Sequence, residues 1–254
     1  MVRTPFPTGI AAADAFVNVL HTDAHAALGD AFIGMLLLGS LATGDFDPLH
    51  SDVDFLIVTR TQPNAMQFDA LQEMHARIRT SELPFCRNYE GAVIPLENLR
   101  RYRTQDVHAW LGSDGHFAWE AQNSDWILQR HIAREYGVVV SGPDPCDLID
   151  PITPDERARA TADLLREWWR PKLADPRDLH DAEYQAYAIL TMCRARYTLA
   201  THEITSKSAA ARWLSERSDP HIADAIARAL RWRHGENLDA FDAALRMIRE
   251  TTDD

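Results

Sequence analysis

Two hydrophobic patterns alternate along the first 150 residues. Apolar residues recurring near a period of 3.6 predict helices over residues 9–28, 63–79 and 125–136. Short, continuous apolar runs predict strands over residues 32–38, 52–59 and 87–95, and residues 137–141 are expected to form a short strand or an extended exit from the preceding helix. Residues 41–48 contain Gly44 and Pro48 and are expected to form a turn-rich link, and Pro63 is expected in the first turn of its helix.

The pattern changes after residue 150, where no strand is predicted. Residues 142–145 and 150–154 are rich in turn formers and mark the boundary. Thr153, followed by Pro154 and Glu156, is typical of a capped helix start. Helices are predicted over residues 154–170, 182–202, 207–217, 220–234 and 238–250. We therefore predict an α+β protein with a mixed β-sheet and flanking helices over residues 1–150 and an all-α helical bundle over residues 151–254.

Composition is that of a globular chain, with 46% hydrophobic and 25% charged residues. The longest clean apolar run, residues 35–38, is far too short to span a membrane, and no signal core follows the N-terminus. Cys86, Cys146 and Cys193 are widely spaced, which fits a reducing compartment and indicates no zinc site. We expect a cytoplasmic monomer without a membrane partner.

The formal net charge of -12 bears on the choice of partner. An acidic surface repels phosphate backbones, so no nucleic-acid partner is expected. A cationic small molecule would be attracted, although many cytosolic proteins are acidic for solubility alone.

Candidate chemistry is concentrated in Gly39-Ser40 and, eleven residues later, Asp52-Val53-Asp54. Residues two apart on a strand face the same side, so Asp52 and Asp54 point together while Val53 and Phe55 pack on the other face. Two adjacent carboxylates repel by about 4 kcal/mol at an effective dielectric near 20, so a cation between them is expected. Hard oxygen ligands favour Mg²⁺, completed by substrate phosphates and water, in the arrangement of a phosphoryl-transfer site.

The residues around this pair can complete such a site. Gly39 allows close approach of a ligand, and Ser40 offers a hydroxyl and a backbone N–H to phosphate oxygens. Glu90, in the next predicted strand, is a candidate metal ligand or proton acceptor. Each piece alone is ordinary, because Asp-x-Asp is usual on a solvated strand face, and Gly-Ser is usual in turns such as the one expected at Gly112-Ser113. The order of the pieces along successive elements makes the catalytic hypothesis the better one.

Gly39-Ser40 with Ser51-Asp52-Val53-Asp54 on a hydrophobic strand resembles the DNA polymerase β-like nucleotidyltransferases. Residues 37–40 and 51–56, together with residues 187–194 and 205–214, are similar to the aminoglycoside adenylyltransferases that act on streptomycin and spectinomycin. The resemblance covers nearly the whole chain. It identifies residues 1–150 as a nucleotidyltransferase domain and residues 151–254 as its helical partner domain, with the active site in the cleft between them.

The resemblance implies roles for individual residues. Asp52, Asp54 and Glu90 would hold Mg²⁺, with Glu90 also acting as the catalytic base. Gly39, Ser40, Ser51, Arg194 and Lys207 would bind ATP, the last two at its phosphates, where a leaving pyrophosphate requires positive charge. Taken singly, Arg194 and Lys207 are typical surface residues.

The acceptor side departs from the family pattern. An acidic residue is common there at the start of the helix that carries Arg194, whereas the matching position here is Tyr184, flanked by Asp181 and Glu183. Trp119 matches a tryptophan that stacks on streptomycin, with Glu120 beside it, and packing is the alternative role for Trp119. The implied reaction is transfer of AMP from ATP to a hydroxyl of such an antibiotic, releasing pyrophosphate. The alternatives are the same chemistry on another small molecule or a protein side chain, and a non-catalytic nucleotide-binding protein.

Overall fold

The computed structural model describes residues 6–49, 51–233 and 235–253. The chain forms two compact units, Met1–Pro151 and Ile152–Asp254, and each has its own hydrophobic core. The two units are described separately below.

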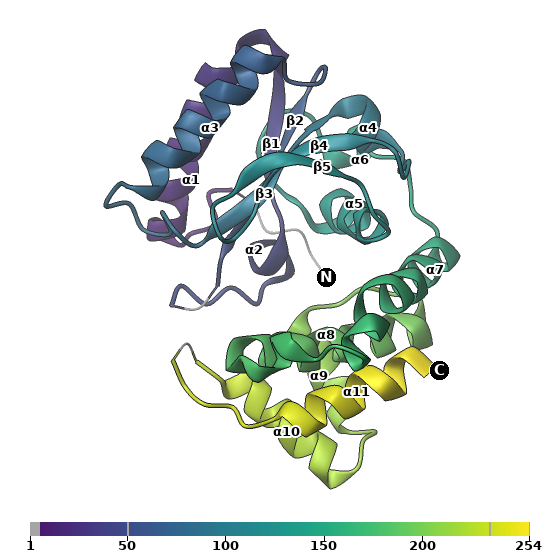
Figure 1. Cartoon of the computed structure of the whole chain (residues 1–254). Helices are drawn as coiled ribbons and strands as arrows, with labels where there is room; N and C mark the ends of the chain where they lie inside the picture. Colours follow the sequence, from purple (N-terminus) through teal and green to yellow (C-terminus); the bar gives the residue numbers. More distant parts are fainter. Residues whose placement is uncertain (1–5, 50, 234, 254) are drawn as a thin grey trace. The chain divides into compact units, whose positions relative to one another are not determined.

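The first unit is built on a six-stranded mixed sheet (Figure 1). Its strands follow the order β5-β4-β3-β2-β1-β6, in which β2 and β3 are parallel and the other neighbours antiparallel. The strands are β1 Phe32–Leu37, β2 Val53–Thr59, β3 Tyr89–Pro95, β4 Val107–Leu111, β5 Phe117–Ala121 and β6 Val138–Ser141. The predicted mixed sheet is confirmed, but the sequence reading missed the β4–β5 hairpin. Gly112-Ser113 forms the expected turn within it, where the Gly112 N–H donates to the His116 carbonyl at 3.0 Å.

Helices cover both faces of this sheet (Figure 1). Helices α1 (Ala11–Leu28) and α3 (Ala65–Arg79) lie side by side on one face, where they bury Val53 and Phe55 of β2. Helix α5 (Asp125–Tyr136) lies on the opposite face, and its Trp126 ring stands 4.3 Å from the ring of His108 on β4. The short helices of this unit are α4 Leu96–Arg100 and α6 Pro145–Leu148, with a 3₁₀ turn at Gly29–Ala31.

Two local predictions are corrected by the structure. Helix α3 begins at Ala65 because Asn64 and Gln67 form a reciprocal capping box, so Pro63 precedes the cap and is not in the first turn. The expected turn-rich link begins instead as the five-residue helix α2 (Gly39–Thr43), which ends at Gly44 in the left-handed conformation.

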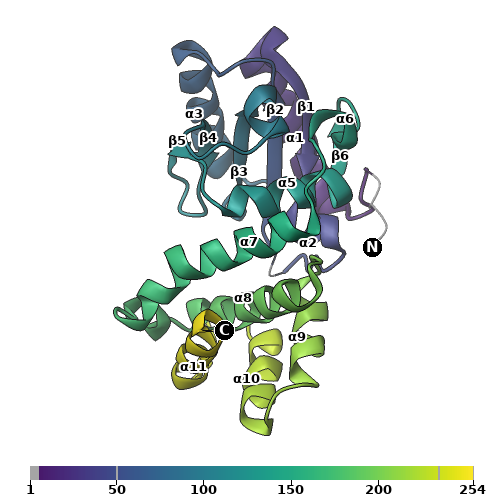
Figure 2. The same cartoon turned by 90° about the vertical axis from the view of Figure 1, so that its right-hand side faces the viewer.

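The second unit consists of helices joined by loops, and its described residues include no strand (Figure 2). Its helices are α7 Pro154–Leu164, α8 Ala182–Thr201, α9 Lys207–Ser215, α10 Pro220–Arg231 and α11 Phe241–Asp253. A π-helical turn, Leu165–Trp169, and 3₁₀ turns at Arg170–Leu173 and Arg177–His180 connect α7 to α8. The predicted cap at Thr153 is confirmed, since its hydroxyl accepts the Glu156 N–H while the Glu156 carboxylate accepts the Thr153 N–H at 2.8 Å.

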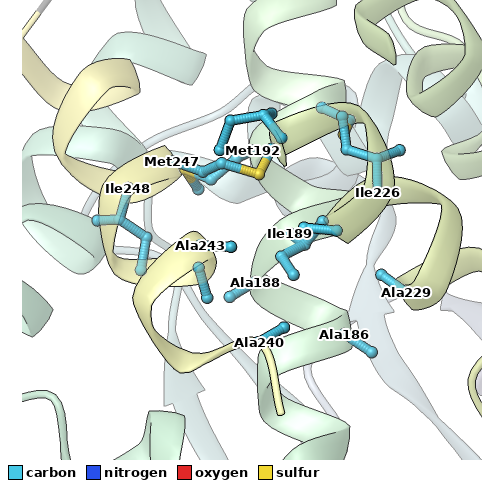
Figure 3. Packing of buried hydrophobic residues seen from close by; sticks show 14 of the residues in the cluster. Ala186, Ala188, Ile189, Met192, Ile226, Ala229, Ala240, Ala243, Met247 and Ile248 are labelled. Carbon is cyan, nitrogen blue, oxygen red and sulfur yellow. The ribbon is translucent and has the colours of Figure 1, made fainter. Parts of the chain in front are cut away.

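Helix α8 is the centre of this second core (Figure 3). Its Ile189 and Met192 are fully buried between Ile226 of α10 and Met247 of α11. Small residues such as Ala188 allow the helices to approach closely. Within the described part of the chain, no helix combines the length and apolarity needed to cross a bilayer.

Candidate active site

Strand pairing brings two of the predicted carboxylates together. Asp54 on β2 and Glu90 on β3 are direct partners in the parallel register. Partners on neighbouring strands point to the same face, and this face is opposite to the one that buries Val53 and Phe55. Both acidic residues are only partly buried. Asp54 and Glu90 therefore lie side by side near the start of the parallel strands β2 and β3.

Asp52 and Ser51 belong to the segment that leads into β2. Asp52 lies one residue before the strand and is exposed. The strand start is held by the Val53 N–H, which donates to the Asn88 carbonyl at 3.0 Å. The Ser51 hydroxyl accepts the Asp47 N–H at 3.0 Å, so it orders the preceding loop. Asp52 is thus an exposed residue two positions before Asp54 in the sequence.

Gly39 lies directly against the Asp54 carboxylate. Its φ of +52° is a left-handed conformation that favours glycine, and a Cβ added there would lie 1.7 Å from Asp54 Oδ2. The adjacent Leu38 N–H donates to the Asp54 carbonyl at 2.9 Å. Gly39 and Ser40 also form the first residues of α2, whose start has no side-chain cap. The Gly-Ser motif therefore adjoins Asp54, whose carboxylate occupies the place that a side chain at position 39 would need.

These residues fit a Mg²⁺ site completed by a substrate. In the ranges 6–49, 51–233 and 235–253, no group of three His, Cys, Asp or Glu side chains could hold a metal ion by itself. Mg²⁺ commonly takes only one or two protein carboxylates and fills its shell with phosphate oxygens and water. Asp54, with Glu90 as its direct strand partner and Asp52 two residues before it, matches that donor set.

A buried pair behind the site anchors the start of β3. Tyr89, the neighbour of Glu90, places its hydroxyl 3.1 Å from Nδ1 of His75 on α3. Burial, helped by the nearby Arg79 charge, lowers the pKa of His75 to about 3. Burial raises the pKa of Tyr89 above its usual value. Both side chains are therefore neutral near pH 7, and the strand that carries Glu90 is tied to α3.

Trp119 and Glu120, two of the predicted acceptor-binding residues, lie on β5 and are distant from Asp54 and Glu90. Trp119 stacks on Phe68 of α3, with ring centroids 4.8 Å apart, which places it on the sheet face opposite to that of Asp54. Glu120 lies on the same sheet face as Glu90, but β5 is two strands away from β3. The partner of Glu120 on β4 is His108, which is nearer the other end of the strands than Glu90. Standard strand spacings place Glu120 about 13 Å along the strands and about 10 Å across them from Glu90. The structure thus favours the packing alternative for Trp119.

The remaining acceptor residues gather at the start of α8. Asp181 is the N-cap and accepts the Tyr184 N–H at 2.9 Å, and Glu183 is exposed in the first turn. Tyr184 is partly buried, with its ring centroid 5.6 Å from that of Tyr187. The sequence reading missed the neighbouring Lys172 and Trp168, whose ammonium and ring lie 4.7 Å apart.

The two predicted phosphate-binding residues both lie in the second unit. Lys207 begins α9 and places its ammonium 5.6 Å from the Tyr187 ring centroid. Arg194 follows Tyr187 by seven residues on α8, which puts it on the same helix face about two turns further along, or about 10 Å at 1.5 Å per residue.

Comparisons with known proteins match both units. A model of the nucleotidyltransferase domain matches residues 31–107, which include Asp52, Asp54 and Glu90. A model described as aminoglycoside adenylyltransferase, C-terminal domain, matches residues 147–254, which include Arg194 and Lys207.

Whole-chain relatives agree with these matches. An aminoglycoside (3'') (9) adenylyltransferase of Escherichia coli is 25% identical over 228 residues, covering 84% of this chain and 82% of the relative. One of Klebsiella pneumoniae is 27% identical over 195 residues, covering 71% and 70%. The crystal structure of spectinomycin adenyltransferase AAD(9) from Enterococcus faecialis, with ATP and spectinomycin, superposes with a TM-score of 0.75. It is 21% identical and the match covers 94% of this chain and 97% of that one.

Proposed function

Because the chain belongs to the aminoglycoside adenylyltransferases, we propose that it transfers AMP from ATP to a hydroxyl of a streptomycin- or spectinomycin-class antibiotic and releases pyrophosphate. The observation that carries the proposal is the in-register pair of Asp54 and Glu90 beside the side-chain-free Gly39. Family membership also removes the alternative of a non-catalytic nucleotide-binding protein.

The reaction assigns a task to each residue of the first unit. Gly39, Ser40 and Ser51 line the place for the triphosphate, and Asp52 and Asp54, with Glu90, would hold Mg²⁺. When bound, the ion supplies positive charge to the phosphate oxygens. Glu90 accepts the proton of the acceptor hydroxyl, whose oxygen forms a bond to the α-phosphorus. The bond from the α-phosphorus to the bridging oxygen of the β-phosphate breaks, and pyrophosphate leaves.

We assign Arg194 and Lys207 to the phosphates of ATP. Support comes from the need for positive charge on a departing pyrophosphate, and from the position of Lys207 beside Tyr187, which shares a face of α8 with Arg194. For the cationic acceptor we propose Asp181, Glu183 and Tyr184, which lie together in the first turn of α8 and join two acidic groups to an aromatic ring. The overall charge of -12 favours such an acceptor.

The test is a mass measurement on the antibiotic. Purified protein is incubated with ATP, Mg²⁺ and either streptomycin or spectinomycin, and pyrophosphate release is followed in parallel. A mass gain of one AMP on either drug is the expected result. Measurable ATP binding without product from either drug would refute the acceptor class and point to the alternative, the same chemistry on another small molecule or a protein.

Two variants make the test specific to the carboxylate site. Asp54→Asn should abolish turnover, since the substitution removes a charged metal ligand while preserving shape. Asp23→Asn is the matched control, because Asp23 pairs with Arg77 on the α1–α3 side of the sheet at 2.9 Å. Full activity in Asp54→Asn would show that the metal assignment is wrong.

A further inference from the structure

Gly91 is a site of close contact between the two strands that carry the carboxylates. It pairs in register with Phe55, one residue beyond the Asp54–Glu90 pair. A Cβ added to Gly91 would lie 2.1 Å from the Phe55 carbonyl oxygen and 2.8 Å from both Cγ and Cδ1 of the Phe55 ring. The space that any other side chain would need is therefore filled by β2 itself.

Phe55 has no room to yield. It is 1% exposed, and its ring packs against two other rings of the core, which also contact each other. The ring centroid of His75 is 5.8 Å away at an interplanar angle of 28°, and that of Tyr89 is 6.1 Å away at 34°. His75 and Tyr89 are held to each other by their hydrogen bond. The most crowded of the three atoms, moreover, is the backbone carbonyl oxygen, which no rotamer change of Phe55 can move.

We infer that Gly91 is a positioning residue for catalysis, which sets the distance between Asp54 and Glu90. Only the expected loss of kcat rests on the proposed function; the spacing of the two carboxylates does not. A side chain at position 91 must lengthen the contact with the Phe55 carbonyl from 2.1 Å to at least 3.0 Å, and β3 must move away from β2 to provide it. Glu90 precedes Gly91 on the same strand, so the proton acceptor moves with it while Asp52, Asp54 and Gly39 stay in place.

The test compares Gly91→Ala with Gly34→Ala. Gly34 is a matched control in the same sheet, because its added Cβ would lie 2.5 Å from the Ser141 carbonyl oxygen, at the β1–β6 pair. Both variants should lose stability. A misplacement near 1 Å lowers turnover about 100-fold, so Gly91→Ala should lose kcat to that extent. Its KM for ATP should stay within about threefold, since the nucleotide-binding residues do not move. Gly34→Ala should keep kcat.

Crystal structures of the two variants provide a readout that needs no acceptor. The Cα separation of Asp54 and Glu90 should increase in Gly91→Ala and stay unchanged in Gly34→Ala. If the wild-type protein turned over neither antibiotic, the proposed function would fail while this comparison still decided the role of Gly91. An unchanged separation, or equal losses of kcat in the two variants, would overturn the inference.

A double variant keeps the test decisive if Gly91→Ala does not fold. Phe55→Ala with Gly91→Ala removes the contacts with Cγ and Cδ1 of Phe55 and keeps the contact with the carbonyl oxygen. The same widening is expected, whereas Phe55→Ala alone should lose stability and leave the separation unchanged. Widening in Phe55→Ala alone would assign the spacing to general core packing and contradict a specific role for Gly91.

Discussion

Gly39→Ala provides the sharpest test of the active site, because Gly44→Ala is nearly identical in every other respect. The two glycines stand at the two ends of α2, with φ values of +52° and +80°. A left-handed alanine costs about 1–2 kcal/mol at either position. In a chain of this size each kcal/mol lowers Tm by about 2–4 °C, so both variants should show a similar small drop.

Only one of the two added methyl groups meets the active site. At Gly44 nothing lies within 4 Å of the new Cβ, whereas at Gly39 the Asp54 Oδ2 lies 1.7 Å away. Asp54 must therefore retreat by more than 1 Å to reach a tolerable contact. A displacement of that size lowers turnover about 100-fold, or about 2.7 kcal/mol of transition-state stabilisation.

The assay is pyrophosphate release at saturating ATP, with thermal denaturation of each variant alongside. Gly39→Ala should lose about two orders of magnitude in kcat/KM, and Gly44→Ala should retain wild-type turnover. Equal activity in Gly39→Ala and Gly44→Ala would refute the placement of Asp54 in the reaction.

Three further predictions concern stability and the second unit. Burial lowers the pKa of His75 to about 3 and of His108 to about 4, so below pH 6.5 the unfolded state binds more protons. Stability is fully present above pH 6.5 and should fall by about 2 kcal/mol per histidine at pH 5, measured by urea unfolding; an equal midpoint at pH 5 and 7.5 would contradict this. Thr153→Ala should cost about 1 kcal/mol in the same assay, and no loss would show that the cap contributes nothing. Lys207→Ala should raise KM for ATP or lower kcat, while Arg231→Ala, an exposed residue at the end of α10, does neither; no effect at Lys207 would mean that Lys207 does not bind the nucleotide.

Elements with strong local signals were predictable from the sequence. Helix α5 and strand β2 begin and end within one residue of the predicted bounds, because their apolar patterns are clear. The Thr153 cap follows from the Thr-Pro-x-Glu sequence at the start of α7. The hairpin of β4 and β5 was missed because its strands are only five residues long and β5 is mostly exposed, so hydrophobic alternation is weak.

Candidate residues were less predictable where they depend on pairing between distant strands. The sequence indicated that Asp54 and Glu90 lie on successive strands, but the parallel register that makes them direct partners is a tertiary property. The same applies to Trp119, whose stacking on Phe68 depends on which face β5 presents to α3. The role of Gly91 had one available signal, an isolated glycine inside a strand, which often marks a close backbone approach.

The position of β6 next to β1 determines when the sheet of the first unit can be completed during synthesis of the chain. Leu37 pairs with Val138, so the sheet is completed by a strand that leaves the ribosome about a hundred residues after its neighbour. Until then β1 has an unpaired edge, and exposed edges invite association with other chains. A fragment ending near residue 107, where the nucleotidyltransferase match stops, would keep that edge permanently and would also lack most of β4 and all of β5. The smallest fragment that can close the sheet ends after Ser141.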